Sequence, residues 1–200
     1  HGAYCGDIDL TGHRKPISHY RETLWTENAP TFLAVREPDG WRGRTATTRW
    51  SAWPTYAHWD FPGWEGGKVT VEVYTREPHV KLTLNGRLVG ERDVSAETSW
   101  MASFEVDYEP GELKANGVSL KTPGKPEKVR YAEERIGRLA WIVAEVVDKD
   151  GIVCPWADWD VTFEGDVIAT CSGNMADNTP ATSKTRRTWQ GRAMAVRRAP

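Results

Sequence analysis

A single amphipathic helix followed only by strands is the feature that most constrains this fold. Residues 16–26, PISHYRETLWT, begin with Pro16, which suits a first helical position, and Pro30 follows where the helix must end. The apolar positions follow helical spacing: Ile17, Tyr20 and Leu24, with Trp25 beside them. A lone helix has no partner helix inside a β-sandwich. We therefore expect residues 1–27 to be the end of a larger domain.

The rest of the chain reads as short strands separated by turns. KVTVEVYT alternates apolar and polar residues, and Asn85-Gly86 is the strongest two-residue hairpin signal. TPGKPEK, at residues 122–128, has the composition of a linker, and a second series of strands follows it. Further strands are expected at 32–35, 50–67, 100–108, 113–118, 142–146, 161–163, 167–169 and 188–196.

This pattern predicts a mainly β fold with two antiparallel sandwiches of the immunoglobulin-like type. The first is expected at residues 48–122 and the second at 123–200, with 28–47 as a connecting segment. Both would be smaller than a typical domain of this type, so we expect them to lean on each other or on a further domain.

Composition excludes several classes of partner. The net charge of −2 gives no reason to expect nucleic acid or an anionic membrane, and no apolar run is long enough to cross a bilayer. The three cysteines, Cys5, Cys154 and Cys171, show neither a CxxC pair nor metal-ligand spacing. We expect no metal and no cofactor, and half-buried thiols, with a Cys154–Cys171 bridge as the alternative.

Tryptophan is abundant, with eleven residues. An indole ring can stack on a sugar, or it can fill a core while its N–H finds a partner. Trp53, Trp59 and Trp64 lie within twelve residues, which suggests a stand-alone carbohydrate-binding module as an alternative function. Such a platform needs at least two coplanar rings facing solvent. We expect Trp64 to be the most exposed of the three and Trp59 to lie in the core.

Asp7, Asp9 and His13 are the polar candidates of the N-terminal loop. Side chains two residues apart share a face in extended backbone, and a retaining glycosidase needs two carboxyl groups about 5–5.5 Å apart. Such groups must flank the scissile bond from opposite sides, however, so Asp7 and Asp9 are expected to turn the chain or cap a backbone amide. The basic run at residues 184–198 is expected to be a solvated strand face rather than a nucleic-acid site.

Three separated segments resemble family 2 glycoside hydrolases of the β-galactosidase group. An I-D-L-x-G-x-x-K-x-x-x-x-Y pattern, which ends the catalytic barrel in that family, falls on Ile8, Asp9, Leu10, Gly12, Lys15 and Tyr20. Residues 57–90 resemble the immunoglobulin-like domain that follows the barrel. Their matching positions are His58, Trp59, Phe61, Glu65, Gly66, Val69, Val71, Val73, Tyr74, Thr75, Leu82, Leu84, Asn85, Gly86 and Gly90. Residues 143–163 and 189–196 resemble the last sandwich of the same architecture.

The resemblance implies that residues 1–27 are the last loop and helix of a (β/α)8 barrel and that the chain is the C-terminal, non-catalytic part of a retaining glycosidase. The two catalytic glutamates of that family match no residue of this sequence, so the chain alone is expected to be inactive. Substrate contacts, if any, would come from Asp7, Asp9, His13 or Trp64. The carbohydrate would bind mainly through the catalytic domain, and a homo-oligomer in the periplasm or secreted medium of a bacterium is expected.

Two stretches depart from the family pattern. Residues 120–139 and 164–168 are shorter than in the family. We therefore expect one strand to be missing or compressed in each. A third functional class, an adhesion array of repeated sandwiches, is disfavoured because the two halves share no repeat and the chain starts with a helix.

Overall fold

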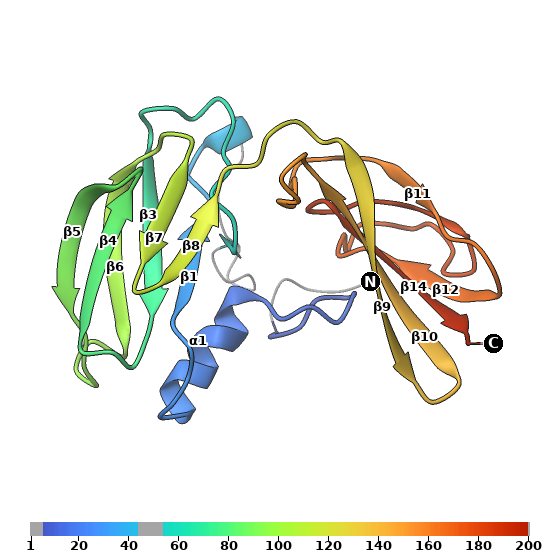
Figure 1. Ribbon diagram of the computed structural model, residues 1–200, viewed down its shortest axis with the longest axis horizontal. Helices are drawn as coiled ribbons and strands as arrows, with labels where there is room; N and C mark the ends of the chain where they lie inside the picture. Colours follow the sequence, from blue (N-terminus) through green and yellow to red (C-terminus); the bar gives the residue numbers. More distant parts are fainter. Residues whose placement is uncertain (1–5, 44–53, 200) are drawn as a thin grey trace. The chain divides into compact units, whose positions relative to one another are not determined.

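The computed structural model describes residues 6–43 and 54–199, which form two compact units (Figure 1). The N-terminal unit comprises residues 14–122 together with the short stretch before residue 9. The C-terminal unit comprises residues 123–199 together with the turn at residues 9–13. The fold is mainly β, as predicted, and the pairings between named strands are antiparallel. Within the described residues, no helix is both long and apolar enough to cross a bilayer.

Helix α1, Pro16–Trp25, starts with proline as the sequence predicts. Its last carbonyl groups have no partner inside the helix, and Arg76 supplies one from outside. Nε and Nη2 of Arg76 donate to the carbonyl oxygens of Thr23 and Leu24 at 2.5 and 2.7 Å. A positive charge is favourable at this end of a helix, so Arg76 fastens α1 to the sheet that follows.

Helix α1 packs on a β-sheet of the N-terminal unit, although only Pro16 and Thr23 of its residues are buried. His19 stacks on Phe32 of strand β1, Phe32–Arg36, with ring centroids 3.9 Å apart. Tyr20 meets Tyr74 of strand β3, Lys68–Tyr74, at 4.9 Å. Trp25 is 79% exposed and lies outside the packed stripe.

Two four-stranded sheets form the N-terminal unit, with the orders β2-β1-β3-β6 and β5-β4-β7-β8. The other strands are β2 Thr55–Tyr56, β4 His79–Leu84, β5 Arg87–Asp93, β6 Met101–Asp107, β7 Glu112–Ala115 and β8 Val118–Lys121. Both sheets contribute buried side chains to the core, among them Val69, Val71, Val73, Val80, Leu82, Leu84, Phe104 and Leu113.

Strand β3 is buried on both faces, although its sequence alternates. The three valines face the core as predicted. Glu72 and Tyr74, on the opposite face, are only 3% and 2% exposed. The Glu72 carboxylate accepts hydrogen bonds from Arg36 and from the Tyr74 hydroxyl, both at 2.5 Å, which offsets the cost of burying its charge. Helix α1 and Arg36 thus cover the face of β3 that carries Glu72 and Tyr74.

Two asparagine–glycine turns set the second sheet. Asn85 and Gly86 have φ of 51° and 78°, which is the left-handed geometry of a tight hairpin, and they join β4 to β5 as predicted. Asn116 and Gly117 repeat this geometry, with φ of 44° and 83°. The single strand expected at residues 113–118 is therefore wrong, because this turn splits the segment into the hairpin β7–β8.

The aromatic stretch expected to be one strand is mostly loop in its described part. Residues 50–53 lie outside the described residues, and after them only β2 is a strand. Trp59 and Phe61 enter the core from this loop and are fully buried. Trp59 Nε1 donates to the Glu109 carbonyl at 2.9 Å, so its polar atom is satisfied inside the protein.

The C-terminal unit has a four-stranded sheet, β12-β14-β10-β9, and a two-stranded sheet, β11-β13. The bounds are β9 Lys128–Ile136, β10 Leu139–Val147, β11 Asp160–Thr162, β12 Val167–Cys171, β13 Thr185–Arg187 and β14 Arg192–Arg198. Side chains from the two sheets share one cluster: Ile142, Ala144, Val161, Phe163, Ala193 and Ala195.

Strand β9 contradicts the expectation of a missing strand in residues 120–139. Its nine residues pair with β10 from Ile136 opposite Leu139 to Lys128 opposite Val147. The sequence KVRYAEERI shows little apolar alternation because this edge strand exposes nearly all its side chains. Pairing with β10, rather than burial, holds it in place.

The described cysteines form no disulfide, and the alternative Cys154–Cys171 bridge is wrong. Cys154 is 3% exposed, and Cys171 is half-buried at the end of β12. Cys5 lies outside the described residues.

Candidate functional site

Asp9 organises the turn at residues 9–13. Its Oδ1 accepts hydrogen bonds from the Thr11 amide at 2.8 Å, the Thr11 hydroxyl at 2.7 Å and the His13 amide at 3.0 Å. The Asp9 amide donates to the His13 carbonyl at 2.9 Å and closes the turn. An aspartate that binds backbone amides just ahead of it is a common device for turning a chain. The expected structural role of Asp9 is therefore present in the geometry.

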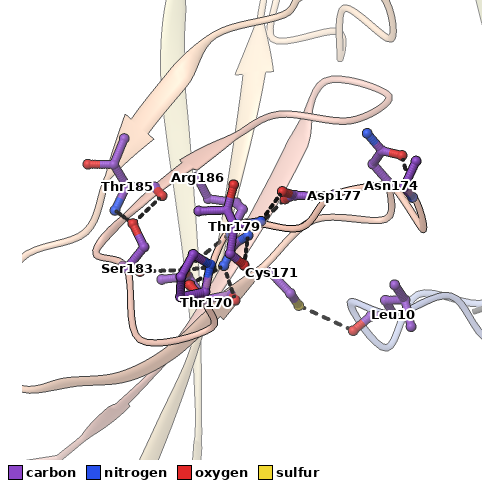
Figure 2. Close-up of polar contacts among 11 residues, drawn as sticks. Leu10, Thr170, Cys171, Asn174, Asp177, Thr179, Ser183, Thr185 and Arg186 are labelled. Atoms are coloured by element: carbon purple, nitrogen blue, oxygen red, sulfur yellow. Dashed lines mark hydrogen bonds and ion pairs between the residues drawn. The ribbon is translucent and has the colours of Figure 1, made fainter. Parts of the chain in front are cut away.

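This turn lies on the sheet of the C-terminal unit. A β-carbon built on Gly12 would lie 3.2 Å from Cζ2 of Trp141, so the glycine permits close contact with the indole of β10. The Leu10 carbonyl accepts a hydrogen bond from Sγ of Cys171 at 3.3 Å (Figure 2). Burial raises the pKa of the Cys171 thiol, which keeps it a donor. The turn is thus fixed at two points.

Asp9 also meets a residue pair from the far end of the chain. A β-carbon on Gly173 would lie 3.3 Å from Oδ2 of Asp9 and 3.0 Å from Cδ1 of Trp189. Trp189 flanks a two-residue turn made by Gln190 and Gly191, whose φ are 51° and 70°. Gly173 and Trp189 were not among the candidates predicted from sequence. The high tryptophan content of the chain suggests that some tryptophans have a special role. No neighbouring residue, however, distinguishes Trp189 from the other ten.

His13 ends the turn in a half-buried, charged environment. Burial lowers its pKa, Arg192 lowers it further, and Asp9 and Glu145 act in the opposite direction. Its Nε2 is buried and has no hydrogen-bond partner among the described residues. Glu145 pairs with Arg192 at 2.8 Å and with Arg130 at 2.6 Å. His13 is therefore kept neutral beside a compensated charge network.

Asp7 has a separate role in the N-terminal unit. Its carboxylate pairs with Arg21 of α1, and its carbonyl accepts a hydrogen bond from the Lys15 amide at 2.8 Å. Asp7 and Asp9 therefore belong to different units, each held by its own neighbours. Each carboxylate is held by structural contacts within its own unit.

Trp64 is half-buried on the N-terminal unit. Its Nε1 donates to the Lys68 carbonyl at 3.1 Å, and its ring lies directly on Gly67. It lines a pocket with several charged side chains, including Arg36 and Glu105. The two-ring platform of a binding module is not seen among the described residues, since Trp59 is buried and Trp53 lies outside them.

The polar loop at residues 172–184 is held by one buried arginine. Arg186 is 3% exposed, so the expectation of a solvated basic face is wrong for this residue. Its guanidinium makes six hydrogen bonds, and the acceptors are Thr170 Oγ1 (from two nitrogens), Thr170 O, Asp177 Oδ2, Thr179 O and Pro180 O. Figure 2 shows Arg186 among Thr170, Asp177 and Thr179. A planar fork of five donors can satisfy acceptors spread over several positions, whereas lysine has three donors on one atom. The loop that carries Gly173 is thereby fixed.

These groups suit binding better than catalysis. Asp9 provides an acceptor and Trp189 a donor and an aromatic surface, and the neighbouring carboxylates of Asp177 and Glu145 are paired with Arg186 and Arg192. Across residues 6–43 and 54–199, no group of three or more His, Cys, Asp or Glu side chains is placed to hold a metal ion.

Comparison with known proteins gives two family matches. Residues 134–200 match the glycoside hydrolase family 2 C-terminal domain 5, and residues 66–122 match a domain of unknown function, DUF4982. The chain is 23% identical over 214 residues to the β-galactosidase BoGH2A of Bacteroides ovatus, an alignment that covers 97% of this chain and 22% of that protein.

Solved structures of family 2 enzymes are also similar to this chain. A family 2 glycosyl hydrolase from Bacteroides cellulosilyticus DSM 14838 is 33% identical, with a TM-score of 0.87 over 98% of this chain and 29% of that one. A β-glycosidase from Bacteroides vulgatus, 22% identical with a TM-score of 0.75 over 96% of this chain and 24% of that one, shares the fold. The chain thus spans less than a third of the length of each relative.

These matches do not favour the stand-alone sugar-binding module, because they run to one part of larger glycosidases. They agree with the resemblance noted in the last part of the chain, residues 143–163 and 189–196. Residues 134–200 therefore form a C-terminal domain of the type found in glycoside hydrolase family 2, and the relatives support a C-terminal portion of such an enzyme for the chain.

Proposed function

We propose that this chain is the non-catalytic part of a β-galactosidase-like retaining glycosidase, in which it braces a catalytic (β/α)8 barrel. Residues 1–27 would be the last loop and helix of that barrel, and residues 48–122 and 123–200 two immunoglobulin-like sandwiches joined to it by residues 28–47. The observation that carries the proposal is the 33% identity, over 98% of the chain, to a family 2 glycosyl hydrolase.

Exposed apolar side chains near the N-terminus support a barrel contact. Ile8, Leu10 and Trp25 are 59%, 46% and 79% exposed. Ile8 and Trp25 belong to the N-terminal unit and Leu10 to the C-terminal unit, so each unit has an exposed apolar side chain available for contact with a further domain. Arg76 and the His19–Phe32 stack hold α1 on its sheet. A barrel in contact with α1 would therefore also be linked to the sheet behind it.

The chemistry would lie in the barrel. A retaining glycosidase uses one carboxylate as nucleophile and one carboxylic acid as proton donor, and passes through a covalent glycosyl-enzyme intermediate. Barrel enzymes place such groups at the ends of several strands. The carboxylates Asp7 and Asp9 have other partners, so the contribution of this chain is to support the barrel and its mouth.

The test compares the product of the complete gene with this chain on a panel of 4-nitrophenyl β-glycosides, beginning with the galactoside. The complete product should hydrolyse at least one of them, and NMR should show the β-anomer of the sugar as the first product. The chain alone should show no turnover. Turnover by the chain that disappears in Asp7→Ala or Asp9→Ala would overturn the proposal, as would an α-anomer formed first by the complete product.

A further inference from the structure

We propose that strand β9 pairs antiparallel with β9 of a second copy of this chain. A twofold axis at Ala132 relates the two strands, so the four-stranded sheets of the two C-terminal units join into one continuous sheet. Two features of β9 lead to this pairing: its open edge and the charges along it. The pairing does not depend on the proposed function.

The edge of β9 is long, regular and open. β9 lies last in the sheet β12-β14-β10-β9, and no strand pairs with its other side among residues 6–43 and 54–199 (Figure 1). Its nine residues stay in register with β10 throughout, without a proline or a bulge. An edge strand presents a row of unpaired N–H and C=O groups to another strand. Proteins commonly block such edges by shortness, proline, bulges or charge, and of these β9 has only charge.

The charges on one face of β9 are not balanced within the chain. Arg130 and Arg192 both bind the single carboxylate of Glu145, at 2.6 and 2.8 Å, so one positive charge is left over. Lys128 and Glu134 lie on the same face as Arg130, because side chains two residues apart in a strand share a face. Both are exposed and have no ion-pair partner among the described residues. β9 therefore begins with unbalanced positive charge and carries free negative charge near its end.

An antiparallel second copy brings these opposite charges together. With the axis at Ala132, Arg130 of each copy stands directly opposite Glu134 of the other. Lys128 of each copy is then the diagonal neighbour of that Glu134, and opposite charges in such positions stabilise a strand pair. A shift of one residue in either direction would place Arg135 opposite Lys128 or Arg130, where like charges oppose pairing. The charges that block an unrelated strand thus favour a copy of β9, and favour this register over a shift by one residue.

The remaining side chains of β9 suit the same pairing. Ala132 meets its own counterpart at the axis, where a small side chain leaves room for the two strands. Ile136 is 62% exposed and stands opposite Lys128 of the other copy, whose aliphatic stem can cover it. On the reverse face, Glu133 is already paired with two arginines, at 3.1 and 2.7 Å, so pairing encloses no unbalanced carboxylate there.

Sedimentation equilibrium of the 200-residue chain across micromolar concentrations tests the association. We expect a reversible monomer–dimer equilibrium that high salt weakens, because salt screens exposed charges. Glu134→Arg should weaken the dimer by about tenfold or more, since both symmetric attractions become repulsions. The matched control is Glu97→Arg, which makes the same change of charge at an exposed position of the N-terminal unit and should leave the dimer unchanged.

Cysteine cross-linking tests the register. Directly opposite residues of an antiparallel pair have Cα atoms about 4.5–5.5 Å apart, which a disulfide can bridge. Ala132→Cys should therefore give an intermolecular disulfide with oxidised glutathione. Ile136→Cys is the control, because it places the two thiols at opposite ends of the paired strands, and it should cross-link no more than the wild type.

Amide hydrogen exchange followed by NMR identifies the surface. Alternate amides of β9 should exchange quickly in dilute solution and become protected as the dimer forms. Thermal melts show whether each variant folds; if Glu134→Arg does not, cross-linking and exchange still decide. The pairing is refuted if the chain stays monomeric at every concentration, if Glu134→Arg associates as tightly as Glu97→Arg, or if Ile136→Cys cross-links as readily as Ala132→Cys. A dimer that leaves the β9 amides unprotected would refute it as well.

Discussion

Replacing Arg186 by lysine should unfold the C-terminal unit at a clearly lower temperature, although the charge is conserved. The guanidinium is 3% exposed and donates six hydrogen bonds from three nitrogens. A lysine has three donors on one atom, so about half of these bonds are lost. The carbonyls of Thr179 and Pro180 compete with Asp177 for the donors that remain.

The magnitude follows from the number of bonds lost. A hydrogen bond contributes about 1 kcal/mol net, and an acceptor left buried without a partner costs about 1–3 kcal/mol. Three lost bonds therefore predict a destabilisation of about 3 kcal/mol. In a domain of this size each kcal/mol lowers the melting temperature by about 4–8 °C, so the C-terminal transition should fall by more than about 10 °C.

Scanning calorimetry of the 200-residue chain measures this effect, and NMR spectra recorded during heating assign each transition to its unit. The matched control is Arg187→Lys. Arg187 is the next residue, its side chain is 58% exposed, and it pairs with Asp158 and Asp160 on the surface. Exposed ion pairs are screened by solvent and contribute little to stability, so the control should melt close to the wild type. Equal shifts for the two variants would refute the reasoning that Arg186 is desolvated.

Three further predictions concern acid, the core and the helix. Burial raises the pKa of Asp177, but hydrogen bonds from Thr179 and Arg186 outweigh it and lower the pKa from 3.8 to about 2. The stability that Asp177 contributes is thus complete above about pH 4 and lost as the pH falls towards 2. Near-UV circular dichroism should show this loss. Asp177→Asn should remove the part of the pH dependence that Asp177 causes. Leu82→Asp and Phe104→Asp should each unfold the N-terminal unit, because both side chains are buried, and unchanged melts would mean that the core faces are inverted. Arg76→Met should speed hydrogen exchange of the α1 amides while leaving β3 protected, and unchanged exchange would exclude Arg76 as an anchor of the helix.

Local elements were predictable wherever backbone chemistry decides them. Pro16 starts α1 because its fixed φ suits the first helical position. Asn85-Gly86 joins β4 to β5 because both residues tolerate the positive φ that the tight turn needs. Asn116-Gly117 carries the same hairpin signal and forms the turn between β7 and β8. Strand β9 was missed for a different reason: its exposed edge residues are charged, so no apolar alternation marks it.

The candidate site was only half visible in the sequence. Asp9 and His13 lie in a short N-terminal loop rich in polar residues, so both were candidates from the sequence. The hydrogen bonds of Asp9 show the turn-forming role expected for it. Trp189 lies 180 positions further along the chain, and its neighbourhood with Asp9 depends on pairing of distant strands. No spacing rule connects residues so far apart.

The sequence by itself determined the antiparallel β class, the hairpin turns and the resemblance to family 2 glycosidases, since these depend on residues close together or on preserved motifs. Only the tertiary structure decided which polar groups are buried. Arg186 belongs to a run expected to be solvated, yet the loop at residues 172–184 encloses it. Glu72 is a charged residue of an alternating strand, yet Arg36 and α1 cover it. A charged side chain can be buried wherever enough partners converge on it, and that convergence is a property of the fold rather than of any local segment.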